Sequence, residues 1–305
     1  MEFGKVDKTT LGTIDFSLPE NGRSAQELLT GKRDPDPKVY VGAAKWGRKE
    51  WLGLIYPAKT RDANFLAEYV NHFNGIELNA TFYKIHTEAG TKKWAASAKD
   101  KYFKFCPKFP KSISHSGDLN APKIQALTTD FLTGLTGFGP KLGPVFLQLS
   151  EQFGPQRKEQ LLAYLQQLPK DVRFFLEVRH PHWFSQIETR KWLFSALHDA
   201  GIGAVITDTA GRRDAVHMEI TTPETMIRFV GNGLHPTDYK RVDEWAIRIN
   251  QWLDKGLKEV HFYVHQPDET FTPEMVKYVV EKFNIVCGLE LEVPHFVPAT
   301  GSLFG

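Results

Sequence analysis

The sequence predicts a TIM-type (β/α)8 parallel barrel, and three observations support this fold class. Short apolar segments typical of strands alternate with amphipathic segments typical of helices from Lys38 onward. Eight such strand segments fall within roughly 260 residues, which is the usual size of this barrel. The first strand continues as V-G-A-A-K-W rather than as a glycine-rich G-x-G-x-x-G loop, which disfavours a nucleotide-binding Rossmann domain. An open doubly wound sheet is the alternative.

Residues 1–37 are expected to be an extension that precedes the barrel. They are polar and carry turn-forming residues at Pro19–Gly22 and Asp34–Pro37. Ser24-x-x-Glu27 resembles a capping box, which predicts a short helix over residues 25–30. Residues 38–305 are then expected to form a single barrel domain.

The expected elements follow one another in regular alternation. Strands are predicted over residues 39–43, 75–79, 102–108, 144–149, 173–179, 203–208, 226–230 and 260–265. Helices are predicted over residues 64–73, 92–98, 124–135, 158–168, 190–199, 242–253 and 273–283. The sequence between the sixth and seventh strands shows no convincing helix, so we expect the barrel to be irregular there.

Residues 74–83, N-G-I-E-L-N-A-T-F-Y, carry the first functional signal. Apolar and polar residues alternate along this segment as they do along the two faces of an extended chain. In a parallel barrel, Ile76 and Leu78 would contact the helices, whereas Glu77 and Asn79 would face the lumen. A buried carboxylate in that position needs either a partner that offsets the cost of its burial or a functional role that explains it.

Polar side chains recur near the C-terminal ends of the other strands, where the active sites of such barrels form. The further inward-facing candidates, in strand order, are Lys104 and Lys108, Gln148, Glu177 and Arg179, Asp208, Arg228, and His265 or Gln266.

Glu77 and Glu177 are the candidate catalytic pair. Two carboxyl groups across a lumen can act as acid and base when their surroundings separate their pKa values. Asp208 would then orient a base or a water molecule. The alternative is a structural ion network in which the basic residues of strands three, five and seven neutralise the carboxylates, because a buried carboxylate without a partner is costly.

The basic residues suggest a pocket for an anionic or phosphate-bearing ligand. Arginine offers a planar fork to phosphate or carboxylate, and lysine offers a point charge. The candidate substrate-binding residues are Trp46, Asn79, Tyr83, Lys108, His115, Gln148, Arg179, His180 and Arg228. Within this set, Trp46 and Tyr83 could stack on a sugar or base. Two interpretations compete with this one. The rim charges are solvated and paired with each other, and the aromatic side chains only pack the loops.

A metal site is not favoured, and no organic cofactor is expected. Carboxylates and histidines on several strands could bind a divalent ion, but H-x-H and H-E-x-x-H spacings are absent and the neighbouring cations would repel it. Cys106 and Cys287 are expected to be free thiols, with Cys106 inert in a strand. Lys108 could form a Schiff base with a carbonyl substrate, as a less favoured alternative.

Composition excludes several classes. The formal net charge of +2 gives no bulk electrostatic argument for binding nucleic acid or a membrane. No apolar run reaches membrane-spanning length, and the first ten residues do not resemble a signal peptide. We therefore expect a cytoplasmic protein without a membrane partner.

Several segments together resemble the YecE-like family, known as domain-of-unknown-function family 72. The resemblance covers residues 38 to about 290 and includes E-L-N-A-T-F-Y (77–83), K-F-P-K-S-I-S-H (108–115), E-V-R-H-P-H-W-F (177–184) and I-R-F-V-G (227–231). It implies a TIM-type barrel and no particular activity. The chain departs from the family pattern at residues 44–48, at Val230 and at His265-Gln266, which indicates a specialised rim.

The leading functional prediction is an enzyme that acts by acid–base chemistry on an anionic ligand at the C-terminal barrel mouth, with hydrolysis of a glycosidic or phosphoester bond as the expected reaction. A nucleic-acid-binding or nuclease-like barrel is one alternative. A non-catalytic ligand sensor is the other.

Overall fold

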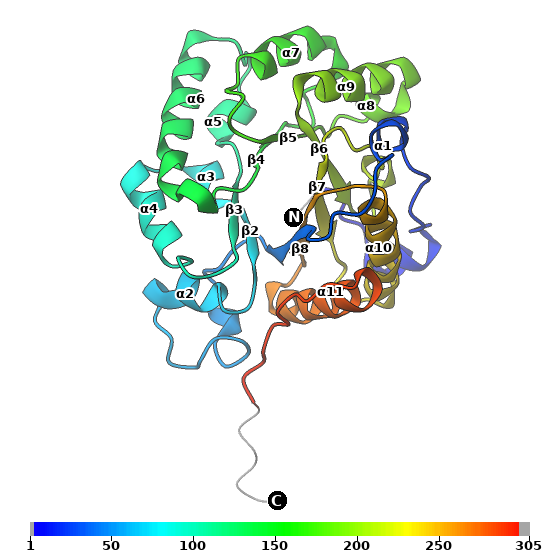
Figure 1. Ribbon diagram of the computed structural model, residues 1–305. Helices are drawn as coiled ribbons and strands as arrows, with labels where there is room; N and C mark the ends of the chain where they lie inside the picture. Colours follow the sequence, from blue (N-terminus) through cyan, green and yellow to red (C-terminus); the bar gives the residue numbers. More distant parts are fainter. Residues whose placement is uncertain (1–2, 299–305) are drawn as a thin grey trace, which may run out of the picture.

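The computed structural model describes residues 3–298, and it shows eight parallel strands arranged as a barrel inside a ring of helices (Figure 1). The strands are β1 (Lys38–Ala43), β2 (Gly75–Leu78), β3 (Lys104–Pro107), β4 (Val145–Gln148), β5 (Phe174–Glu177), β6 (Gly203–Asp208), β7 (Glu224–Val230) and β8 (Glu259–His265). The predicted TIM-type fold is confirmed.

The barrel is nearly closed, and its weakest seam lies between β3 and β4. The hydrogen-bonded order is β3-β2-β1-β8-β7-β6-β5-β4, so β8 pairs with β1 in the way that a barrel requires. Across the seam, isolated bridges join Phe105 to Leu142 and Lys108 to Phe146. The Phe109 amide also donates to the Phe146 carbonyl at 2.9 Å. These bonds hold the C-terminal ends of β3 and β4 together.

The helices lie outside the strands. They are α1 (Arg23–Leu28), α2 (Phe65–Tyr69), α3 (Ala80–Tyr83), α4 (Glu88–Ala96), α5 (Lys111–Ser114), α6 (Pro122–Leu135), α7 (Lys158–Gln166), α8 (His182–Ser185), α9 (Ile187–Ala200), α10 (Pro236–Asp254) and α11 (Thr272–Cys287). All predicted helices are present, although their ends differ by several residues. Between β6 and β7 only a 3-10 turn forms, at Arg213–Ala215, so the predicted irregularity is confirmed.

Three short helical turns that the sequence analysis missed, α3, α5 and α8, follow β2, β3 and β5 directly. The expectation that the alternation of residues 74–83 reflects one extended chain is therefore wrong beyond Leu78. Thr81 explains the turn, because its buried hydroxyl oxygen lies 2.8 Å from the carbonyl oxygen of Leu78 and 2.8 Å from that of Lys108, so its one hydrogen can bond either of them. The turn folds Phe82 back toward the barrel mouth and leaves Tyr83 76% exposed.

The lumen is filled by side chains in layers, as expected for a packed barrel rather than a pore. The middle layer is apolar and consists of Cys106, Phe146, Phe175, Val205, Met226 and Tyr263. Polar layers lie above and below it. The upper layer, at the C-terminal ends of the strands, contains Glu77, Lys108, Gln148, Glu177, Arg228 and His265, all buried.

The N-terminal extension forms a strap along the outside of the barrel. Here the strap means residues 3–33. In Figure 1 its helix α1 lies beside α9 and α10. Asn21 accepts a hydrogen bond from the Trp252 indole at 2.9 Å, and Arg33 donates to Asn250 and Asp254 on α10.

The predicted capping box at the start of α1 is not formed. The N-cap is Gly22, and Ser24 lies inside the helix, where its amide and hydroxyl donate to Glu219 at 2.9 and 2.6 Å. Glu27 pairs instead with Arg23 at 2.7 Å. A Cβ at position 22 would lie 2.2 Å from the Cδ of Glu219, so a larger residue there would have to displace the carboxylate that accepts from Ser24.

None of the helices in the described part of the chain is both long enough and apolar enough to cross a membrane.

Candidate functional site at the barrel mouth

The centre of the mouth is Arg228, which joins two carboxylates from opposite sides of the lumen. Its Nε and Nη2 donate to both oxygens of Glu77, each at 2.8 Å, and its Nη1 donates to Glu177 at 2.6 Å. All three side chains are at most 2% exposed. The predicted convergence of Glu77 and Glu177 at one end of the barrel is therefore real, and we call the three residues the Glu–Arg–Glu bridge.

Each carboxylate of the Glu–Arg–Glu bridge has further donors. Glu77 receives hydrogen bonds from Asn79 at 3.0 Å and has His265 Nε2 at 2.8 Å from its other oxygen. Glu177 accepts from Arg179 Nε at 2.7 Å. Bidentate and charge-assisted bonds of this kind are among the strongest hydrogen bonds in proteins. They offset the cost of taking two carboxylates out of water.

The donors keep both carboxylates ionised. Burial alone would raise the pKa of Glu77, but Arg228 and His265 hold it well below its ordinary range. Burial would likewise raise the pKa of Glu177, but Arg179, Arg228 and Lys108 lower it to about 2. A group with such a low pKa is a poor proton donor and a weak base near neutral pH. The geometry therefore supports the ion-network interpretation of this pair.

Lys108 is the cation of the upper layer that has no carboxylate partner within salt-bridge distance among the residues that the structure describes. Its ammonium donates to Gln148 Oε1 at 2.7 Å and lies 4.3 Å from the centre of the Phe82 ring and 5.9 Å from that of Phe146. Burial, together with the positive charge of Arg228, lowers the pKa of Lys108 to about 7, although Glu77 and Glu177 act in the opposite direction. Lys108 thus changes its charge near neutral pH.

His115 lies among several positively charged side chains at the mouth. His115 follows α5, its ring lies edge-on to Phe82 at 5.6 Å, and its Nδ1 lies 2.9 Å from the Ser114 hydroxyl. Burial lowers the pKa of His115, and the charges of Lys108, Lys111 and Arg179 lower it further. His115, Lys108 and Arg179 therefore lie close enough together for their charges to interact, as the anion-pocket prediction requires.

Phe3, at the start of the strap, covers one side of the mouth. Its ring lies 4.3 Å from the guanidinium carbon of Arg179 and 4.9 Å from that of Arg212. The Thr209 hydroxyl lies 3.2 Å from the Phe3 carbonyl, and the Gly211 amide donates to the Gly4 carbonyl at 2.8 Å. Phe3 is 5% exposed, so the strap forms part of the wall of the mouth. Nothing in the local sequence around Phe3 predicted this position.

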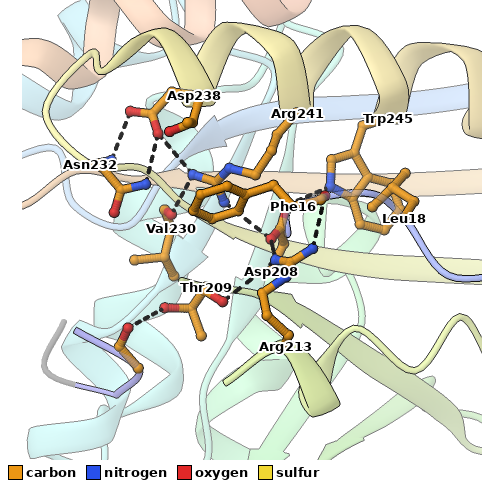
Figure 2. Close-up of polar contacts among 12 residues, drawn as sticks. Phe16, Leu18, Asp208, Thr209, Arg213, Val230, Asn232, Asp238, Arg241 and Trp245 are labelled. Atoms are coloured by element: carbon orange, nitrogen blue, oxygen red, sulfur yellow. Dashed lines mark hydrogen bonds and ion pairs between the residues drawn. The ribbon is translucent and has the colours of Figure 1, made fainter. Parts of the chain in front are cut away.

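Asp208 does not face the lumen, and its expected placement there is wrong. Figure 2 shows its carboxylate between Arg241, Trp245 and Arg213: it accepts from Arg241 at 3.1 Å and from the Trp245 indole at 2.8 Å, and it is paired with Arg213. The physical reason is the parity of the strand. Thr207, not Asp208, is the register partner of the inward-facing Arg228. Asp208 therefore anchors α10 and has no place in the candidate site.

The other predicted site residues lie at the rim or pack the loops. The indole of Trp46 stands edge-on to that of Trp94 at 5.3 Å, which fits a packing role. His180 accepts from the His182 amide at 3.2 Å. Tyr83 is exposed on α3 and touches Phe82 edge-on at 5.3 Å. Arg212 is paired with Asp214 at 2.7 Å, as the competing interpretation of the rim charges expected.

A second polar layer closes the opposite end of the lumen. Within the described residues, Glu224, Glu259 and His261 offer atoms close enough together to hold a metal ion. Arg173 supplies a positive charge to this cluster, because it pairs with Glu224 and with Glu259, each at 2.9 Å. The cluster is therefore satisfied without a metal, and its place at the N-terminal end of the strands indicates a role in stability.

One surface hollow lies away from the mouth. A groove of about 950 Å³ runs between α1 and α9 and is lined by, among others, Arg23, Leu28, Ile187, Trp192 and His198. The polar groups that converge in it are engaged with each other, as for Glu219 with Ser24 and Arg190. Converging titratable side chains, rather than volume, identify the mouth as the candidate site.

Comparisons with known proteins agree on one family. The model of the family described as "Protein of unknown function DUF72" matches residues 40–294. The chain is 30% identical over 284 residues to UPF0759 protein YecE of Escherichia coli (strain K12), covering 87% of this chain and all of that protein. It is 25% identical over 255 residues to UPF0759 protein YunF of Bacillus subtilis (strain 168), covering 73% of this chain and 86% of that protein.

Solved structures support the same fold. A DUF72 family protein from Enterococcus faecalis V583 superposes with a TM-score of 0.65 and 16% sequence identity, covering 84% of this chain and 100% of that one. A DUF72 family protein from Thermotoga maritima MSB8 gives a TM-score of 0.57 and 20% identity, covering 83% of this chain and 100% of that one. At these identities the likeness concerns the barrel and not its chemistry.

Proposed function

Since the chain belongs to the DUF72 family of proteins of unknown function, we propose its function from the mouth itself: it is an enzyme that binds a small anionic molecule there and uses Lys108 for acid–base chemistry. The observation that carries this proposal is the position of Lys108, a buried amine beside Phe82 and Gln148 whose pKa is lowered to about 7. Groups that exchange protons near the working pH are the effective catalysts of proton transfer.

In this proposal, the Glu–Arg–Glu bridge is a fixed frame and not the acid–base pair. Hydrolysis of a glycosidic bond, one of the two reactions expected from the sequence, needs one protonated carboxyl group, and the donors around Glu77 and Glu177 favour the ionised form of both. The bridge holds the ends of β2, β5 and β7 in register, so that Lys108 on the neighbouring β3 side of the lumen has defined surroundings. We assign proton transfer to Lys108 alone.

The preference for an anion follows from the charges of the mouth. Two carboxylates, Glu77 and Glu177, face three cationic side chains, Arg228, Arg179 and Lys108. When Lys108 is protonated, its charge has no carboxylate within salt-bridge distance among the described residues, and it lies in a partly desolvated site where electrostatic interactions are stronger than in water. A phosphate or carboxylate group on the ligand would neutralise it. Asn79 and Gln148 would orient the polar parts of the ligand.

The experiment is a calorimetric titration with sulfate, a divalent anion that does not titrate near neutrality. We expect binding at about pH 6 that weakens severalfold at about pH 8, as Lys108 loses its proton. Lys108→Met should abolish this binding, whereas Lys111→Met, which removes an exposed lysine of the adjacent turn, should retain it. Sulfate that does not bind, or that binds Lys108→Met equally well, would refute the anion site.

Catalysis is tested separately from binding. Wild-type and Lys108→Met proteins are incubated with a panel of small phosphorylated and carboxylated compounds, and the mixtures are followed by mass spectrometry. We expect at least one compound to be converted by the wild type and not by the variant. Anion binding without conversion of any compound would instead favour the non-catalytic sensor.

A further inference from the structure

Three features set the Lys108 amine apart from an ordinary buried lysine. It has no carboxylate within salt-bridge distance among the described residues, so it is not held as an ammonium by direct ion pairing. It is buried beside Phe82 and Phe146, and although ring faces attract a cation, the loss of water around the amine disfavours its charged form. The amine donates a hydrogen bond to Gln148 Oε1 at 2.7 Å, which a neutral amine can also donate while its lone pair stays available.

We propose that Lys108 forms a Schiff base with a carbonyl compound that also carries an anionic group, such as a 2-oxo acid or a phosphorylated ketone. This inference rests on the proposed function, because it assigns the substrate class of the same site. Lysine is the side chain that forms imines with carbonyl substrates, and a desolvated position beside other cations is the usual way in which it is activated.

The charged groups that face Lys108 suit both the neutral amine, which attacks the carbonyl group, and the protonated imine, which forms from it. Arg228 on β7 and Arg179 after β5 favour the neutral amine, which is the nucleophile. Glu77 on β2 and Glu177 on β5 favour a cation at the same place, and the protonated imine is such a cation. His115, and His265 beside Glu77, are further titratable groups at the mouth.

The size of the effect on reactivity follows from the pKa. A lysine with an ordinary pKa near 10.4 is neutral in only about one molecule in a few thousand at pH 7. At the lowered pKa of about 7, about half of the Lys108 amines are neutral at that pH. Lys108 should therefore react with a carbonyl group far faster than exposed lysines such as Lys111, which lies one turn away.

The proposed step conserves atoms and electrons. The lone pair of Lys108 Nζ attacks the carbonyl carbon, a C–N bond forms, and the C=O π electrons move to oxygen. A proton passes from nitrogen to that oxygen, giving a carbinolamine. The hydroxyl group then takes a second proton and leaves as water while the nitrogen lone pair forms the C=N bond. Because the nitrogen keeps its remaining hydrogen, the product is already the protonated imine, the cation that the two carboxylates stabilise.

The test is reductive trapping on the whole protein. Wild-type protein is incubated with pyruvate or with dihydroxyacetone phosphate in the presence of cyanoborohydride, and the modified residue is located by peptide mass spectrometry. With pyruvate we expect one adduct per chain, on Lys108, with the added mass of pyruvic acid less one oxygen atom. The rate should rise between about pH 6 and about pH 8 and then level off, as expected for a pKa of about 7.

Matched probes and variants separate the proposal from general lysine chemistry. Acetone has the carbonyl group without the anion, and lactate has the anion without the carbonyl group, so neither should give the selective adduct. Lys108→Arg keeps a cation but cannot form an imine, and it should give no adduct while its unfolding midpoint shows that it is folded. Lys111→Arg should leave the trapping rate unchanged.

Two kinds of failure are distinguishable. If sulfate binds in a Lys108-dependent manner but neither probe is trapped on Lys108, the Schiff-base inference is wrong and the proposed anion site stands. If sulfate fails to bind and the adducts are spread over exposed lysines with a rate that keeps rising above about pH 9, both proposals are overturned.

Discussion

At the residue scale, the mouth depends on Arg228. Every nitrogen of its guanidinium is directed at a carboxylate oxygen, and its side chain is 1% exposed. Arginine suits this place because its planar fork can serve two carboxylates at once and stays charged when buried. Removing it would leave two buried carboxylates facing each other with too few donors.

We therefore predict that Arg228→Leu lowers the free energy of unfolding by about 3–5 kcal/mol, the usual cost of leaving buried charges without their partner. Equilibrium unfolding in urea measures this change. Arg61→Leu, at an exposed position, is the control and should have little effect. A loss of less than about 1 kcal/mol for Arg228→Leu would show that the bridge contributes little.

The carboxylates of the bridge predict acid sensitivity of a definite sign. The folded-state pKa of Glu177 is lowered to about 2 and that of Glu77 is lowered too, so their stabilisation is complete above the unfolded-state pKa and is lost as the pH falls through the folded-state value. Glu177→Gln should be less stable at neutral pH and should show a flatter decline between about pH 5 and about pH 2. Parallel curves for variant and wild type in urea unfolding would contradict this.

At the element scale, the strap is the part of the fold that most directly shapes access to the mouth. Phe3 lies on Arg179, whereas Phe16, on the same strap, lies on Arg213 and Arg241 beside Asp208, as Figure 2 shows in part. Both phenyl rings lie against guanidinium groups, but they do so in different parts of the molecule. Only the first borders the candidate site.

Phe3→Ala should open the mouth and raise the rate at which Lys108 is arylated by trinitrobenzenesulfonate, an anionic amine reagent. We expect an increase of severalfold, measured by peptide mapping over time, because the ring that covers Arg179 is removed. Phe16→Ala is the matched control and should leave the rate at Lys108 unchanged. Equal rates for all three proteins would mean that the strap does not control access.

Strand periodicity explains which side chains of the site the sequence alone could predict. The alternation around Glu77 and Glu177 predicted inward-facing side chains because β2 and β5 are regular over those residues. The prediction for Asp208 was wrong because the direction of each side chain on β6 depends on how β6 pairs with β7. Thr207, not Asp208, pairs with the inward-facing Arg228. The extended pattern was wrong for residues 80–83, because the Thr81 hydroxyl contacts the nearby Leu78 carbonyl and the distant Lys108 carbonyl, which favours a helical turn over an extended chain.

At the scale of the whole molecule, the strap joins the mouth to the opposite end of the barrel. It passes α9 and α10 and is fixed where Glu219 accepts from Ser24 and from Arg190. Such a contact between distant parts of the chain was not visible in the sequence, since Glu219 lies in a segment without periodicity. The Phe3 wall of the mouth depends on this anchorage.

Glu219→Ala should therefore lower the free energy of unfolding by roughly 2–3 kcal/mol, the loss expected for hydrogen bonds to a buried charged group. It should also make residues 5–22 a preferred site of limited proteolysis. Glu20→Ala, which changes an exposed glutamate of the strap, should do neither. A Glu219→Ala protein whose strap resists proteolysis as well as the wild type would contradict the anchorage.

The most direct test of the central claim is an NMR titration of the Lys108 side chain. In protein with 13C-labelled lysine, the ε-carbon signal that disappears in Lys108→Arg is followed from about pH 5 to about pH 11. We predict a midpoint near the lowered pKa of about 7, moving upward when the protein is saturated with sulfate. A midpoint near 10.4, as for an ordinary lysine, and one that sulfate does not move, would contradict the assignment of Lys108 as the reactive group of the mouth.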